Sequence, residues 1–150
     1  MGAIFSVTAE AEEALVAATA ETLVQLRGAT ATKAKIIEWS VSFDGTASTN
    51  APIVVRLLRQ TTDRTGSAAS EVKWDPDAPD ANCAALHSFS AEPTAGDILA
   101  IYNVHPQSGM VMQYPLGREI VLDNATTSRF AIEATAPDAV NALAYIVWEE

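Results

Sequence analysis

The sequence predicts an all-β protein, an antiparallel β-sandwich or jelly roll of roughly eight to eleven short strands. Apolar runs of strand length recur about every 8–12 residues, and turn-forming Gly, Pro, Asn and Asp residues separate them. The alternation of strand and helix patterns that is typical of a parallel sheet is missing. We expect a single β-sandwich domain over residues 1–150, because this length suits one hydrophobic core.

The first 26 residues are the least clearly patterned part of the chain. Residues 1–20 are interpreted as an N-terminal arm or an edge strand, with weak strands at residues 3–8, 15–18 and 22–26. The Ala and Glu content of residues 9–26 favours helix, whereas Thr22 and Val24 favour strand. We favour strand for this stretch, since residues 22–26 show little helical periodicity.

The clearest strand covers residues 37–43. Ile37, Trp39, Val41 and Phe43 alternate with polar residues, which places the large apolar groups on one face, and Asp44-Gly45 ends the run. Residues 53–58 form the next expected strand. Further strands are expected at residues 98–104, 110–114, 119–122, 129–135 and 141–148, with weaker ones at 71–74 and 86–90.

The expected C-terminal strand is apolar at both alternating sets of positions. Ala142, Ala144, Ile146 and Trp148 occupy one face, and Leu143, Tyr145 and Val147 occupy the other. An antiparallel sheet with one face in water should show one polar face. The second face is therefore covered by the same chain or by another subunit. On the second reading, the subunit-interface candidates are Leu143, Tyr145, Val147, Trp148 and Trp39.

Composition argues against several functional classes. The formal net charge is −10 and the basic residues are scattered, which opposes binding to nucleic acid or to an anionic membrane surface. Cys83 is the single cysteine, so we expect no internal disulfide. Catalytic, metal-binding and cofactor-binding motifs are not recognisable, and we expect a non-enzymatic protein without a cofactor. A hydrolase that uses His87 or His105 with a nearby carboxylate is the catalytic alternative.

The acidic, proline-rich segment 75–80 carries two further hypotheses. Asp75, Asp77 and Asp80 are the best candidates for a calcium loop, although the glycine and the distal glutamate of an EF-hand are missing, and a solvated acidic loop is favoured. Alternatively, Trp74 or Tyr114 could stack on a sugar ring while Asp77 or Asp80 bonds its hydroxyl groups.

Seven segments of the chain resemble small structural proteins of tailed bacteriophages and prophages. The segments are TLVQL (22–26), IEWSVSFDG (37–45), LLRQT (57–61), FSAEPT (89–94), HPQSG (105–109), QYPLGRE (113–119) and AYIVWEE (144–150). The resemblance covers most of the chain after residue 20. Within this group, the chain is similar to capsid decoration proteins, which are also called cement proteins.

This resemblance implies a jelly-roll-like homotrimer on the outer capsid surface of a virion, made in the bacterial cytoplasm. Its partners would be further copies of itself and the major capsid protein, and it would brace the shell without catalysis. An N-terminal arm would then offer Ile4 and Phe5 as shell contacts. The alternative is a receptor-binding or glycan-binding domain of a phage tail or fibre.

Overall fold

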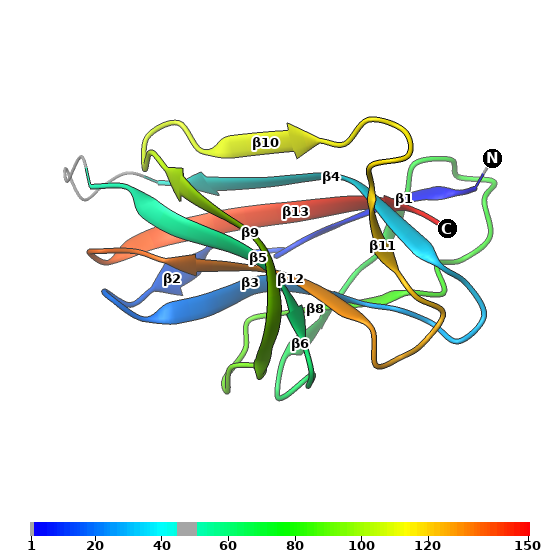
Figure 1. The fold of residues 1–150 in the computed structure, drawn as a ribbon, viewed down its shortest axis with the longest axis horizontal. Coiled ribbons are helices and arrows are strands. Elements are labelled where there is room, and N and C mark those ends of the chain that lie inside the picture. Colours follow the sequence, from blue (N-terminus) through cyan, green and yellow to red (C-terminus); the bar gives the residue numbers. More distant parts are fainter. Residues whose placement is uncertain (1, 45–50) are drawn as a thin grey trace.

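The chain forms two antiparallel β-sheets, as the computed structural model shows for residues 2–44 and 51–150 (Figure 1). The strands are β1 (Ile4–Thr8), β2 (Glu13–Leu15), β3 (Ala20–Arg27), β4 (Ala34–Phe43), β5 (Ile53–Gln60), β6 (Ser67–Ala69), β7 (Val72–Lys73), β8 (Ala84–His87), β9 (Ala95–Val104), β10 (Met110–Gln113), β11 (Ile120–Leu122), β12 (Arg129–Thr135) and β13 (Val140–Glu149). The predicted all-β sandwich is confirmed. In these described residues we find no helix long and apolar enough to cross a membrane.

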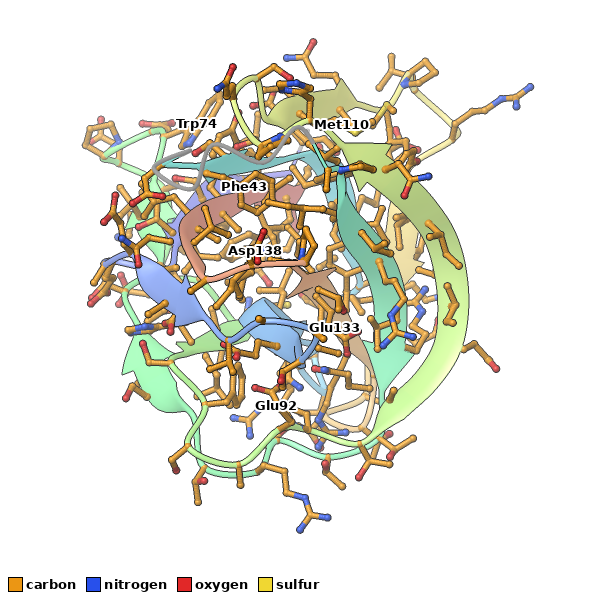
Figure 2. The ribbon with its side chains drawn as sticks, turned by 90° about the vertical axis from the view of Figure 1, so that its left-hand side faces the viewer. Phe43, Trp74, Glu92, Met110, Glu133 and Asp138 are labelled. Carbon is orange, nitrogen blue, oxygen red and sulfur yellow. The ribbon has the colours of Figure 1, made fainter. Side chains whose placement is uncertain are left out.

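The first sheet has the strand order β10-β4-β13-β1-β7, and the second has the order β6-β8-β3-β12-β5-β9. In the first sheet β11 also pairs with β4, and β2 also pairs with β13. Both chain ends lie at the same end of the sandwich, because β1 pairs with β13 and Ile4 is opposite Glu149 (Figure 1). Seen from the other end, β9 curves around one side of the sandwich (Figure 2).

The core lies between the two sheets and contains the largest apolar side chains. Trp39 of β4 and Trp148 of β13 are fully buried there. Phe5 of β1 stacks against Trp148 with ring centroids 5.7 Å apart, and Trp39 packs against Tyr102 of β9 at 5.6 Å. Packing of aromatic rings at these separations stabilises the core beyond the burial of their area.

Residues 4–8 and 13–15 are strands of the first sheet, so of the two alternatives for residues 1–20 the structure shows strands and not a free arm. β1 is hydrogen-bonded to β13 on one side and to β7 on the other. β2 then pairs with β13, from Val140 opposite Leu15 to Ala142 opposite Glu13. The apolar residues of β1 explain this placement, because Phe5 and Val7 point to the same side and both are buried.

Two details of the expected strands differ from the structure. Residues 16–19 form a turn in which Ala18 has φ of 58°, so the strand expected at 15–18 is wrong, whereas the strand expected at 22–26 lies within β3. In β4, a bulge against β13 sets Trp148 opposite Ile36 and Val147 opposite Glu38. Ile36 therefore takes the buried position expected for Ile37. The turn predicted at Asp44-Gly45 includes Gly45, which lies outside the described residues.

Segments of the same chain cover the outer face of the second sheet. In β3 and β12, side chains on both faces of the strand are buried. Gln25 of β3 donates a hydrogen bond to the Thr62 carbonyl at 3.1 Å, and Glu92 accepts one from the Thr22 N–H at 2.9 Å. The segments that follow β5 and β8 therefore shield this face from water.

Candidate binding surfaces

The C-terminal strand β13 is covered mainly by its own chain. Trp148 and Trp39 are core residues without exposed surface, and Val147 is only 1% exposed. These three residues therefore cannot contribute a subunit contact, which corrects that part of the prediction. Sequence alone could not separate the core role of these side chains from an interface role, because both roles require large apolar groups.

Leu143 and Tyr145 keep access to the surface of the first sheet. Leu143 is 41% exposed, and both residues line a hollow of about 370 Å³ with Thr8, Glu10, Ser40, Ser42 and Ala144. The Tyr145 hydroxyl donates a hydrogen bond to Glu38. Burial, followed by this contact with the carboxylate, raises the pKa of Tyr145. Tyr145 therefore remains a neutral donor, and Leu143 is the exposed apolar group of this strand.

Two further hollows meet at Trp74, which follows the edge strand β7. The first, the N-terminal hollow, has a volume of about 620 Å³ and is lined by Gly2, Ala3, Ile4, Trp74, Asp75, Ala78, Pro79 and Glu150. The second, the Tyr114 hollow, has a volume of about 320 Å³ and is lined by Ile37, Glu38, Trp74, Gln113, Tyr114, Leu116, Glu119 and Val147. The structure thus brings together Trp74 and Tyr114, which are 40 positions apart in the sequence.

Of the predicted shell contacts, one remains at the surface. Ile4 is partly exposed in the N-terminal hollow. Phe5 is buried in the core against Trp148, so it has no surface to offer to a capsid. The correction follows from strand geometry, because successive side chains of a strand point to opposite faces of the sheet.

The three aspartates of the acidic segment do not converge on a common point. Asp75 accepts a hydrogen bond from the N–H of Asp77 at 3.0 Å, and Asp80 pairs with Lys73 at 2.8 Å. Among the residues that the structure describes, no group of three or more acidic, His or Cys side chains could hold a metal ion. The calcium loop is therefore not supported, and the aspartates serve local turn and ion-pair contacts.

The histidines and the cysteine occupy separate places. The Cys83 thiol is buried, and desolvation, together with the nearby Glu150 carboxylate, raises its pKa to about 12. His105 belongs to a turn, where its Nδ1 accepts a hydrogen bond from the Gln107 N–H at 3.1 Å. His87 is buried beside Ser88, with 2.8 Å between His87 Nδ1 and Ser88 Oγ.

The catalytic alternative predicted from the sequence pairs His87 with an unspecified carboxylate, and the structure identifies the acidic residues beside it. Glu10 and Glu13 lie 3.9 and 3.8 Å from the two ring nitrogens of His87, and Ser88 donates a hydrogen bond to Glu13. The carboxylates come from the β1–β2 segment of the first sheet, whereas His87 ends β8 of the second sheet. These contacts link the two sheets at one side of the sandwich.

Several charged side chains on and beside the second sheet form ion pairs. Arg56 of β5 binds Glu133 of β12, whose side chain is almost fully buried. Asp63 accepts hydrogen bonds from Arg129 and, at 2.9 Å, from Arg27. The bond from Arg129, aided by Arg27, lowers the pKa of Asp63. In Figure 2, Glu133 and Glu92 lie on the side of the second sheet, away from Trp74.

A further apolar surface lies on β9, the edge strand of the second sheet. Ile98, Leu99 and Ile101 are exposed, and Ile101 reaches 58%. Val121 of β11 is also exposed, and its carbonyl accepts a hydrogen bond from Arg59 of β5, the strand beside β9, at 2.8 Å. We call Ile98, Leu99 and Ile101 the β9 surface. The sequence predicts this strand correctly but does not show that its aliphatic side chains face water.

Comparison of the chain with protein-family models, with curated proteins and with solved structures gives no match.

Proposed function

We propose that this chain is a virion structural protein that binds the outer surface of a tailed-phage capsid as a homotrimer and stabilises the shell. The β9 surface is the observation that supports this proposal most strongly. An exposed, long and apolar edge strand invites pairing, and monomeric proteins usually protect such edges with charge, proline or a covering segment. In β9 the run 98–104 contains no charged residue and no proline.

The occupant of the β9 surface in this proposal is a second copy of the chain. Each copy carries a formal charge of −10, so two copies repel each other wherever their charged surfaces meet. The uncharged run 98–104 of β9 offers a contact without that repulsion. A ring of three copies needs a head-to-tail contact, in which β9 of one copy meets a different surface of the next. The trimer itself rests on the resemblance to decoration proteins.

Attachment to a shell follows from multivalency. A trimer presents the same shell-contact surface three times, so individually weak contacts with neighbouring capsid subunits combine into strong attachment. The negative charge suits an outward-facing position, since a protein on the outer surface needs no contact with DNA. Ile4 remains a candidate for the contact with the major capsid protein.

Co-sedimentation with capsids tests this function. Shells of the phage or prophage that carries the gene, emptied of DNA and stripped of bound protein, are mixed with increasing amounts of the chain. We expect saturable binding and a higher temperature of shell disruption. Absence of binding at micromolar concentrations, on shells that bind their native decoration, would contradict the proposal. A double variant with Ile98→Thr and Ile101→Thr should bind far more weakly, because it loses the multivalent form.

A further inference from the structure

Trp74 is a large, exposed aromatic side chain on a backbone that is hydrogen-bonded to the first sheet. Its indole is 57% exposed, yet its backbone N–H donates a hydrogen bond to the Ile4 carbonyl at 3.0 Å, which extends the pairing of β7 with β1. The side chain lines both the N-terminal hollow and the Tyr114 hollow. A ligand that runs from one hollow to the other would therefore pass over Trp74.

We propose that Trp74 and Tyr114 form a binding site for a neutral oligosaccharide that extends across the two hollows. The C–H face of a pyranose ring packs on an aromatic face, and its hydroxyl groups donate hydrogen bonds to carboxylate and amide oxygens nearby. Ligand sites of this kind combine an apolar surface with a few fixed polar groups. Here Trp74, Tyr114 and Leu116 supply the apolar part, and Leu116 is 93% exposed.

The polar groups at the edges of both hollows are held in place by the protein. In the Tyr114 hollow, Glu38 accepts hydrogen bonds from Gln113 and Tyr145. In the N-terminal hollow, the Glu150 carboxylate accepts hydrogen bonds from the N–H groups of Asn82, at 2.7 Å, and Cys83, at 3.3 Å. A carboxylate offers about four acceptor positions, so each group keeps free positions for sugar hydroxyls. Fixed acceptors lower the entropy lost when a ligand binds.

Tyr114 is fixed in the same way. Its hydroxyl accepts a hydrogen bond from Nε1 of the buried Trp39 at 3.1 Å. Tyr114 is partly buried and packs against the core, so its side chain is held in place at the edge of the hollow. Both aromatic residues of the proposed site are thus tied to the backbone or core of the first sheet.

The charge of the lining selects among possible ligands. Neither hollow is lined by Lys or Arg, whereas Asp75, Glu150, Glu38 and Glu119 line them. A sulfated or otherwise anionic polysaccharide would be repelled by these carboxylates. An extended peptide that adds to the sheet would find only the two residues of β7 at this edge. A neutral saccharide meets neither obstacle, and its binding requires neither the trimer nor a capsid.

Binding to an array of immobilised oligosaccharides tests this site. The array carries neutral glucans, galactans, mannans and N-acetylglucosamine oligomers, together with sulfated saccharides and a lysine-rich peptide, and titration calorimetry follows with the best neutral ligand. We expect binding to at least one neutral class, loss of at least tenfold in affinity for Trp74→Ala, and substantial retention for Trp74→Phe. Gln113→Ala, an exposed substitution outside the core, should also weaken binding.

The Ile98→Thr/Ile101→Thr variant separates this inference from the proposed capsid function. It should keep full saccharide affinity, while Trp74→Ala should leave self-association unchanged. Circular dichroism verifies that each variant is folded. The inference is overturned if the chain binds no neutral saccharide on the array, if it binds only the cationic peptide or the sulfated saccharides, or if folded Trp74→Ala binds as tightly as the original protein.

Discussion

Replacement of Phe5 by alanine tests whether the N-terminal strand is a structural part of the core. Phe5 is buried and packs on Trp148 at 5.7 Å. Truncation of a buried phenylalanine to alanine typically costs about 3–5 kcal/mol, from lost transfer free energy and the remaining cavity. The stacking contact adds about 0.5–1.5 kcal/mol to what burial alone contributes. We therefore expect Phe5→Ala to lower the free energy of unfolding by about 4 kcal/mol.

Urea unfolding, followed by far-UV circular dichroism, measures this loss. Trp148 contacts Phe5, so tryptophan fluorescence would mix local and global changes. With a slope of about 2 kcal/mol per molar urea, the expected loss moves the midpoint down by about 2 M. The control is Ile4→Ala, because Ile4 is the neighbouring, partly exposed residue of the same strand, and it should cost about 1 kcal/mol or less. A loss below about 1 kcal/mol for Phe5→Ala would refute the reasoning, since a residue of a loose arm would behave that way.

Three further predictions concern charged and titratable groups. Arg56→Ala leaves the buried Glu133 without its partner, so it should lower the free energy of unfolding, measured by chemical denaturation, by about 3 kcal/mol. Replacement of Arg56 by Met together with Glu133 by Leu should lower the free energy of unfolding much less. Equal losses in the single and double variants would contradict this prediction. The pKa of Asp63 is lowered in the folded state, so its stabilising contribution is present near neutral pH and disappears as the pH falls through that folded pKa. The unfolding free energies of the original protein and Asp63→Asn should thus differ at pH 7 and converge in acid, and a constant difference would contradict the assignment. Cys83, with its pKa raised to about 12, should react with a thiol reagent at pH 8 only after unfolding, and rapid labelling of the native protein would contradict its burial.

The sequence predicts the elements whose pattern is local. The expected strand 129–135 coincides with β12, and most of the other expected strands overlap observed ones, because alternation and turn residues are both readable within a short window. The bulge in β4 could not be predicted from a short stretch of sequence. It exchanges the roles of Ile36 and Ile37, and it depends on how β4 pairs with β13 more than 100 residues later.

The surface features depend on tertiary contacts that a single sequence does not display. The apolar run of β9 has the composition of a buried strand, and its exposure follows from its place at the sheet edge. Trp39 and Trp148 are large aromatic residues of the kind found at subunit interfaces. In the structure they are buried in the core between the two sheets. The meeting of Trp74 and Tyr114 requires that β7 and β10 flank the same face of the first sheet. Each of these outcomes is set by topology.

Light scattering of the purified chain over a range of concentrations tests most directly the claim that it works by association through β9. The account predicts a particle of three times the 15.9 kDa chain mass, conversion to monomer in the Ile98→Thr/Ile101→Thr variant, and no change in Val16→Thr, a control at a 60% exposed valine in a turn. A 15.9 kDa monomer at every concentration, or the same oligomer in the β9 variant, would contradict it.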